Sequence, residues 1–238
     1  MQRNPSGVVR TLPMADHPCV RFSINIPNFG DFADARTVAA AALAAEQAGW
    51  DALFIWDHVE DEYGSFGEPT DPVILAERLD EGLDLLRRYW SGEQVDHVGR
   101  HYVVDGVTLL PATLQRPHPP VWVGGFWPHR KPMRRAAYWD GVVPLFASAG
   151  HGYFPPVDEV RELVDYVRAQ RGERSGHFEV VLGGVTPSDP AAAAELLEPL
   201  RAAGATWWDE RLPRRDENLC RLEPVLRRIN EGPPRFAG

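Results

Sequence analysis

The chain has 238 residues, of which 44% are hydrophobic, enough to build the core of one large domain or two small ones. Its 25 basic and 34 acidic residues give a net charge of −9, which argues against nucleic acid or an anionic membrane as partner. No stretch approaches the roughly 20 apolar residues of a membrane span, and the first residues lack the apolar core of a signal peptide, so we expect a cytoplasmic protein.

Residues 1–18 mix Pro, Gly, Ser and charged residues without periodicity, and we interpret them as a flexible leader. The two cysteines, Cys19 and Cys220, could form a disulfide only if the two ends of the chain meet. In a reducing compartment we expect free, buried thiols instead.

The first regular elements form a strand, helix, strand unit. Phe22–Asn28 is a short apolar strand, and Ala35–Ala48 is an Ala-rich helix with Asp34 as its N-cap and Gly49 at its C-terminal end. The second strand is Asp51–Asp57. Two strands joined by a helix of this length run parallel, so the loops that follow them leave the sheet at the same edge. Ligands of parallel α/β folds bind at that edge.

The rest of the chain continues the alternation of strand and helix. The further predicted elements are helices over 71–92, 133–138, 158–172, 188–203 and 216–230, strands over 121–123, 142–146, 178–182 and 205–208, and a hairpin or extended excursion over 95–114. Six core strands that alternate with helices predict an α/β fold with a parallel sheet covered by helices.

Several motifs match one known family in the right order. They are Pro27-Asn28-Phe29-Gly30, Ala48-Gly49-Trp50-Asp51, Phe54-Ile55-Trp56-Asp57-His58, Phe66-Gly67-Glu68-Pro69, the run 117–125 and Gly232-Pro233-Pro234-Arg235. In these motifs the sequence resembles the luciferase-like monooxygenase superfamily, whose members bind flavin mononucleotide (FMN) or the deazaflavin coenzyme F-420 in a TIM barrel. The resemblance implies a single shortened (β/α) TIM-like barrel over residues 19–238, because two strand and helix units expected near residues 60–66 are missing.

The resemblance also implies a catalytic role for His58. It places the imidazole at the active-site edge, with Asp57 beside it, where it hydrogen-bonds or relays a proton near the reduced flavin ring. A pKa near neutrality suits an imidazole to that role. Asn28 and Trp56, which follow the first strand and end the second, are candidate cofactor-binding residues. Alternatively, Asp57 and His58 only cap the end of the strand by bonding to neighbouring backbone groups.

The Gly124-Gly125 pair is a candidate phosphate-binding site. We interpret it as opening the loop to the next helix, where glycine lets backbone N–H groups approach a phosphate. Arg130 belongs to a cluster of four basic residues within 130–135 that would favour a phosphorylated ligand. The alternative is a tight strand exit followed by an ordinary solvated helix face.

Gly183-Gly184 is a second candidate anion site, because it precedes another helix at a place where TIM barrels often bind phosphate. A plain strand-to-helix turn is the alternative. The spacing of His97 and His101 occurs in zinc sites, but no further Cys or His completes a set, so we expect no metal.

We therefore expect a flavin- or deazaflavin-dependent oxidoreductase or monooxygenase that transfers hydride or activates oxygen on a small organic substrate. The alternative is a degenerate, non-catalytic member that serves as a flavin-binding or oligomeric scaffold protein, because the missing segment would support one face of the cofactor ring. Loss of strands leaves exposed parallel edges. We thus expect a homodimer in which the partner, or the excursion over 95–114, covers the gap.

Overall fold

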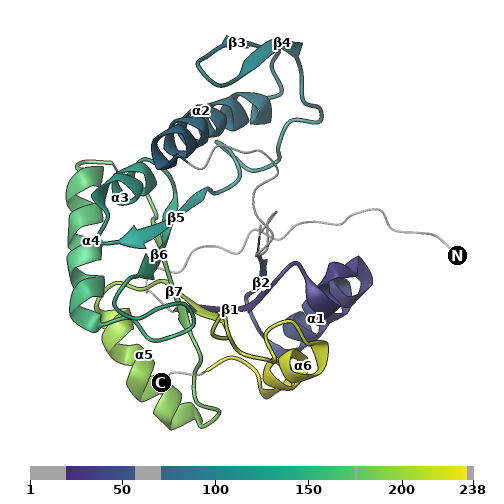
Figure 1. Ribbon diagram of the computed structural model, residues 1–238, viewed down its shortest axis with the longest axis vertical. Coiled ribbons are helices and arrows are strands. Elements are labelled where there is room, and N and C mark those ends of the chain that lie inside the picture. Colours follow the sequence, from purple (N-terminus) through teal and green to yellow (C-terminus); the bar gives the residue numbers. More distant parts are fainter. Residues whose placement is uncertain (1–19, 57–70, 175, 235–238) are drawn as a thin grey trace, which may run out of the picture.

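A six-stranded parallel sheet forms the body of the protein. The computed structural model describes residues 20–56, 71–174 and 176–234. The sheet has the strand order β2-β1-β8-β7-β6-β5, with every neighbouring pair parallel, and curls into half a barrel with helices on its convex face (Figure 1). The strands are β1 Arg21–Ile26, β2 Ala52–Ile55, β5 Trp122–Trp127, β6 Gly141–Phe146, β7 Glu179–Gly184 and β8 Trp207–Glu210. The prediction of a shortened TIM-like barrel with about six core parallel strands is confirmed.

Strands β2 and β5 are the two edges of this sheet. A closed barrel of this type has eight strands, whereas no further strand pairs with β2 or β5 in the described part of the chain. The first and last strands of the chain lie side by side in the middle of the sheet. Ser23 of β1 therefore lies opposite Ala52 on one side and Asp209 on the other.

Local sequence signals set most of the helix bounds. Asp34, the predicted N-cap, caps α1, and Asp71 and Asp189 cap two further helices; each carboxylate accepts a backbone N–H bond of 2.8–2.9 Å. Gly49 ends the first helix with φ +88°. The helices are η1 Gly30–Ala33, α1 Ala35–Ala48, α2 Pro72–Trp90, α3 Arg130–Ala137, α4 Val157–Arg171, α5 Pro190–Ala202 and α6 Leu222–Glu231. Among the described residues, no helix is both long and apolar enough to cross a membrane.

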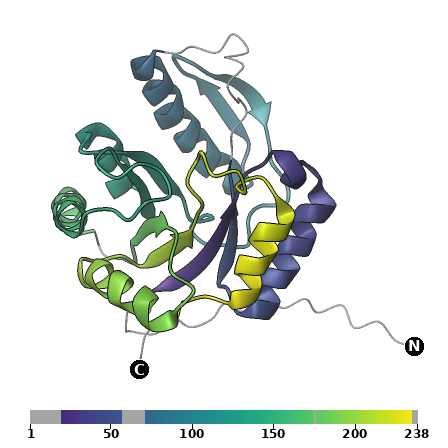
Figure 2. The same cartoon turned by 60° about the horizontal axis from the view of Figure 1, so that its bottom comes forward.

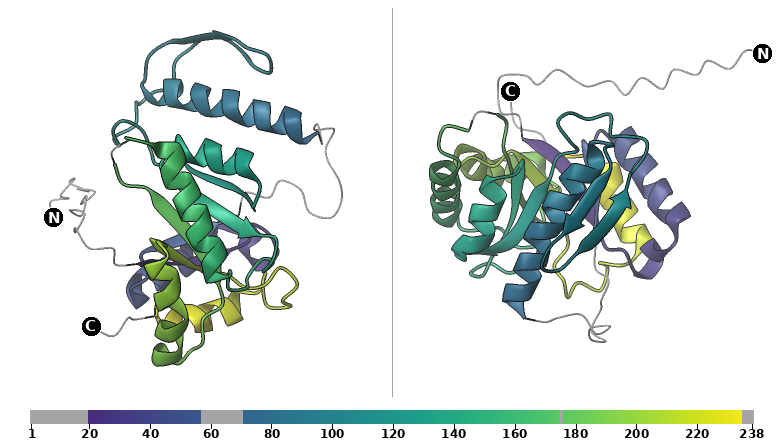
Figure 3. Two further views of the ribbon diagram at one scale, coloured as in Figure 1. Left: turned by 90° about the vertical axis from the view of Figure 1, so that its left-hand side faces the viewer. Right: turned by 90° about the horizontal axis from the view of Figure 1, so that it is seen from above.

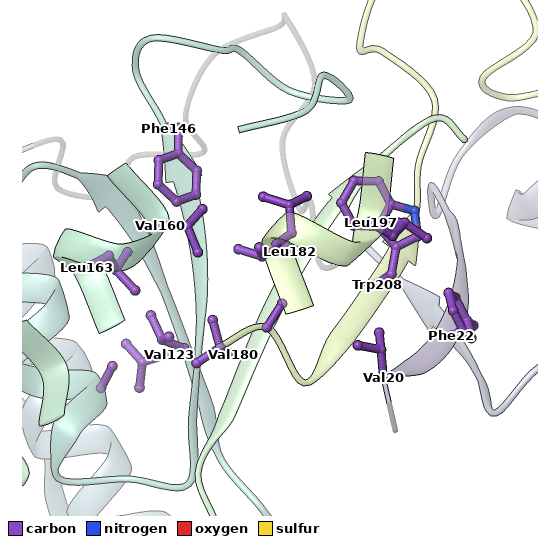
Figure 4. Packing of buried hydrophobic residues seen from close by; sticks show 14 of the residues in the cluster. Val20, Phe22, Val123, Phe146, Val160, Leu163, Val180, Leu182, Leu197 and Trp208 are labelled. Carbon is purple, nitrogen blue, oxygen red and sulfur yellow. The ribbon is translucent and has the colours of Figure 1, made fainter. Parts of the chain in front are cut away.

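A continuous hydrophobic core lies between the convex face of the sheet and the helices. Strand residues such as Ile24 and Leu182 are almost completely buried there, with α4 contributing Leu163 and α5 contributing Leu197. Figure 4 shows Leu182, Leu197 and Trp208 gathered between β7, β8 and α5. Each buried Leu contributes about 2 kcal/mol, so burial on this face stabilises the half-barrel.

Helix α2 and the hairpin β3 Val95–Val98 and β4 Val103–Val107 form a unit that projects from the barrel (Figure 3). The two strands pair only with each other. The imidazoles of His97 and His101 fasten the hairpin to α2, because their Nε2 atoms lie 2.8 Å from Glu81 and 3.0 Å from Glu77. Residues 95–114, predicted as a hairpin or an extended excursion, thus contain a hairpin. In the described part of the chain, this hairpin pairs with neither β2 nor β5 and does not close the sheet.

The last helix is shorter than the predicted 216–230, because α6 begins only at Leu222. Asp216 accepts the N–H of Asn218 with its carboxylate at 2.8 Å, which favours a turn over a helix. The carboxylate of Asp31 then accepts the first N–H of α6 at 2.9 Å. A residue from the other end of the chain therefore fixes where α6 starts, and α6 packs beside α1 (Figure 2).

The predicted leader, residues 1–18, and Cys19 lie outside the described residues. Cys220 is a free thiol, as predicted, but it is half-buried and not buried.

Candidate functional site

The C-terminal edge of the sheet brings two predicted cofactor-binding residues to one side of the fold. Asn28 is exposed in the bend after β1, and Trp56 directly follows β2. The indole N–H of Trp56 donates to Oδ1 of Asn25. The Trp56 ring lies 5.8 Å from the ring of Phe29 and 5.2 Å from that of His151, which belongs to the loop after β6. Trp56 therefore spans the mouth of the half-barrel from β2 to the opposite wall.

The predicted catalytic residues Asp57 and His58 lie outside the described residues, so their roles stay predictions. They immediately follow Trp56 in the chain. Among the described residues, no group of three or more His, Cys, Asp or Glu side chains is placed to hold a metal ion.

The Gly124-Gly125 pair lies inside strand β5, opposite Val143 and Pro144 of β6, and does not open a loop as the sequence analysis expected. A Cβ on Gly125 would come within 2.4 Å of Pro132 on α3, so glycine is needed for the close packing of the helix on the strand. A Cβ on Gly124 would meet nothing closer than the Val143 carbonyl oxygen at 3.8 Å. The two glycines serve opposite faces of the sheet, and only Gly124 belongs to the concave face.

The basic cluster at the start of α3 is partly engaged by other side chains. The guanidinium of Arg130 lies 4.1 Å from the ring centroid of Trp127 and 4.4 Å from that of Tyr166 on α4. Arg135 forms an ion pair with Asp80 of α2. Because Trp127 is part of the core on the convex face, the structure places Arg130 on that side of β5, away from the concave face.

The Gly183-Gly184 pair forms the end of β7 and lies opposite the end of β8. Beyond it, the predicted anion position is filled by the chain itself. The buried carboxylate of Glu210 accepts the backbone N–H of Thr186 at 2.9 Å and its hydroxyl at 2.8 Å, and Arg228 lies 3.2 Å away. A carboxylate of the protein thus takes the hydrogen bonds that a phosphate would need there.

A buried polar cluster on the concave face was missed by the sequence analysis. Asp209 of β8 is fully buried, and its carboxylate accepts the hydroxyl of Ser23 at 2.7 Å and the amide of Asn25 at 2.8 Å. Arg211 adds an ion pair of 2.7 Å. Burial raises the pKa of Asp209 above its ordinary value, and the opposing effects of Arg211 and the two hydrogen bonds do not outweigh it.

Strand periodicity was the signal that would have found this cluster. The last strand, predicted over 205–208, is β8 Trp207–Glu210 and is therefore placed two residues further along the chain. Residues two apart in a strand share a face, so the extension brings Asp209 to the concave face with Ser23, and Arg211 follows in the same direction.

Three aromatic side chains bridge the gap between the two edges of the sheet. The ring of Phe54 on β2 lies 5.6 Å from that of Trp122 on β5 and 5.5 Å from that of Trp207 on β8. The guanidinium of Arg21 covers Trp207 at 4.4 Å. The indole N–H groups of Trp122 and Trp207 are buried and have no hydrogen-bond partner among the described residues. These rings form the floor of the half-barrel, at the first residues of β5 and β8.

Comparison with known proteins places this arrangement in a family. A stretch of an uncharacterized protein of Sinorhizobium fredii is 30% identical over 111 residues, which are 47% of this chain but only 29% of that protein's length. A crystal structure of an uncharacterized protein from Bacillus cereus aligns with 93% of this chain and with 63% of the Bacillus cereus chain. The sequence identity is 13% and the TM-score is 0.27, which is too slight a likeness to support any conclusion. The sequence profile of the luciferase-like monooxygenases matches residues 75–228. With most of its length matched, the chain belongs to the luciferase-like monooxygenase family.

Proposed function

We propose that this protein is a flavin- or deazaflavin-dependent oxidoreductase or monooxygenase that acts on a small organic substrate. Membership of the family supports the proposal. The observation that carries it is the concave face of the half-barrel, where Trp56 stands at the C-terminal edge, Gly124 presents no side chain and two indole N–H groups lack a partner among the described residues. The cytosolic location expected from the sequence belongs to the same proposal.

The hydrogen-bond donors of the concave face fit an acceptor-rich ring. The ring systems of FMN and F-420 carry carbonyl oxygens and ring nitrogens that accept hydrogen bonds. A buried donor without a partner costs about 1–3 kcal/mol, so the N–H groups of Trp122 and Trp207 would gain by meeting such acceptors. No Cβ projects from Gly124 into the same space.

When bound, the cofactor would supply hydride transfer or oxygen activation. The chain would supply position and proton handling. Trp56 would offer an aromatic surface, Asn28 a polar group at the strand end, and His58, oriented by Asp57, would hold or move a proton beside the ring. None of the three predicted phosphate positions keeps the expected geometry, because Gly124 lies inside β5, Glu210 fills the position beyond Gly183-Gly184 and Arg130 packs on the convex face.

The test is titration of the purified full chain with FMN and with F-420, followed by visible absorbance and tryptophan fluorescence. Binding of either with Kd below about 100 μM is expected, and no binding of both at that concentration would end the proposal. If the protein turns over a substrate, His58→Ala should abolish that turnover and leave the midpoint of unfolding nearly unchanged. Unchanged turnover in this variant would remove His58 from the site.

One observation favours a second candidate, a non-catalytic flavin-binding or scaffold protein. The rings of Phe54 and Trp56 reach across the half-barrel to the opposite wall. Binding of a cofactor without any turnover would favour this candidate.

A homodimer is also part of the proposal, because β2 and β5 are unpaired edges of a parallel sheet in the described residues. Exposed edges favour pairing with another chain. Light scattering on the purified protein should give twice the monomer mass of 26.6 kDa. A monomer at all concentrations would contradict this part of the proposal.

A further inference from the structure

A small cavity lies at the C-terminal ends of β1, β7 and β8, beside the buried Asp209 cluster. Its volume is about 140 Å³. Apolar side chains form much of its wall, among them Val185, Leu212 and Val225. Its charged lining residues are Arg211, Arg228 and Glu210. This edge of the sheet is where ligands of parallel α/β folds bind, so the cavity is placed to hold part of a substrate.

The two arginines differ in how much of their hydrogen-bonding capacity the protein already uses. Arg228 donates through Nε to Glu210 at 3.2 Å, through Nη1 to the carbonyl of Gly232 at 2.8 Å and through Nη2 to the hydroxyl of Thr186 at 3.0 Å. Its guanidinium is therefore occupied on every nitrogen. Arg228 helps to build the wall and has little left for a ligand.

Arg211 is only partly used. Its Nη2 pairs with Asp209 at 2.7 Å, while Nε is buried without a partner among the described residues. A Cβ on Gly183 would come within 2.3 Å of that Nε, so the glycine closes off this side of the guanidinium. Nη1 is the remaining donor, and it makes no hydrogen bond within the described residues. Arg211 is one of the residues that line the cavity, and Nη1 is its accessible donor without a partner among the described residues.

Asn218 supplies a second donor to the same cavity. Its backbone N–H is held by the carboxylate of Asp216 at 2.8 Å, which fixes the turn before α6. Its side-chain amide makes no hydrogen bond within the described residues, and the residue lines the cavity with Arg211. Arg211 and Asn218 thus bring a charged and a neutral donor, neither with a partner among the described residues, to the lining of one small cavity.

The geometry points to a subsite for the carboxylate end of a small organic acid, held by Nη1 of Arg211 and the amide of Asn218. Charge-assisted hydrogen bonds to a guanidinium favour a charged acceptor over a neutral one. Arg211 pairs with Asp209 and Arg228 with Glu210, so the cavity has no excess positive charge, and a phosphate dianion would be less favourable there than a monoanion. The apolar wall fits a short carbon chain next to the carboxylate.

This inference names the substrate class of the proposed enzyme and in that sense rests on the proposed function. The volume admits only a few non-hydrogen atoms, so the cavity takes one end of a substrate whose other end extends toward the concave face. The subsite itself needs no cofactor. It can therefore be tested on the full chain alone, and its failure would leave the outcome of the cofactor titration untouched.

The experiment measures binding of propionate, propionamide and inorganic phosphate to the cofactor-free protein by ligand-observed NMR. Propionate should bind with Kd of about 1–10 mM, and the neutral propionamide at least about tenfold more weakly. Asn218→Ala should weaken the binding of propionate about fivefold, and Arg211→Lys should weaken it about tenfold or more. The matched controls Asn230→Ala and Arg161→Lys, both exposed positions, should bind propionate as the wild type does.

Four results would overturn the inference: no saturation by propionate up to about 100 mM, equal binding of propionamide, tighter binding of phosphate than of propionate, or equal weakening in the controls. Arg211→Lys disturbs a buried ion pair, so its fold is checked by circular dichroism. If it does not fold, Asn218→Ala decides the outcome, because that side chain makes no hydrogen bond within the described residues.

Discussion

The neighbouring glycines of β5 allow a sharp test of how the two faces of the sheet differ. In Gly125→Ala, the new Cβ would lie 2.4 Å from Cβ of Pro132, whereas ordinary contacts begin at 3.4 Å. Helix α3 would have to retreat by the difference, 3.4 − 2.4, which is 1.0 Å. Overpacking of this kind costs about 1–3 kcal/mol. At about 2–4 °C per kcal/mol for a chain of this size, the melting temperature should fall by about 2–12 °C.

Gly124→Ala is the matched control, one residue away on the opposite face. Its Cβ would meet no atom closer than 3.8 Å. Alanine is favoured over glycine in a strand by about 0.5–1 kcal/mol, so this variant should be as stable as the wild type or slightly more stable. Its methyl group would project from the concave face and weaken the binding of FMN or F-420, if either binds there.

Calorimetry and urea unfolding measure the free energy of unfolding of both variants. Titration with FMN and F-420 measures whether Gly124→Ala weakens cofactor binding. Equal destabilisation by Gly124→Ala and Gly125→Ala would refute the assignment of the two glycines to opposite faces. A Gly125→Ala protein as stable as the wild type would show that α3 does not pack on β5 as closely as described.

Three further variants probe other parts of the fold. The hydrogen bond from His97, together with the N–H groups of His101 and Tyr102, lowers the pKa of Glu81 from 4.5 to about 2. A carboxyl whose folded pKa is lowered stabilises the protein above its unfolded pKa and loses that effect as the pH falls through the folded one. Glu81→Gln should therefore melt below the wild type at neutral pH, with the difference shrinking from pH 4.5 towards 2; a constant difference would contradict this. Asp189→Ala removes the cap of α5 and should lower the free energy of unfolding, measured in urea, by about 1 kcal/mol. Asp165→Ala, on the exposed face of α4, should change that free energy little. Equal effects of the two variants would contradict the capping role. Phe54→Ala should lower the free energy of unfolding by about 2 kcal/mol and shift the tryptophan emission, because the ring contacts Trp122 and Trp207. An emission spectrum like that of the wild type would argue against these ring contacts. Phe126→Ala is the control, because Phe126 is 53% exposed.

Side chains on both faces of the sheet hold the half-barrel of the described residues together. The convex face keeps a continuous core against the helices, so most of the apolar burial does not depend on closure. On the concave face, Phe54 reaches from one open edge to Trp122 near the other. Aromatic contact replaces backbone pairing at this point, and it also narrows the space in which a cofactor would bind.

Short-range patterns in the sequence were enough to predict the elements. The cap Asp34 and the terminating Gly49 are decided within four or five residues, and the structure confirms both. Asp71 and Asp189 cap their helices through equally local contacts. The alternation of strand and helix likewise indicated the six parallel strands, because a helical crossover leaves few other topologies. The motifs that pointed to the family are contiguous in sequence, so recognising them requires no knowledge of tertiary contacts.

The candidate site depended on contacts between residues far apart in the chain. Gly124 and Gly125 look alike in sequence, and only strand pairing and the position of α3 assign them to different faces. Whether a basic or acidic group is free depends on its neighbours in space: Arg130 is stacked on two rings, and Glu210 fills an anion site. The sequence by itself determined the elements, their order and the family, because those follow from local backbone preferences. The tertiary structure alone decided which polar groups meet, because β8 lies between β1 and β7, and that pairing brings Ser23, from the start of the chain, to Asp209, near its end.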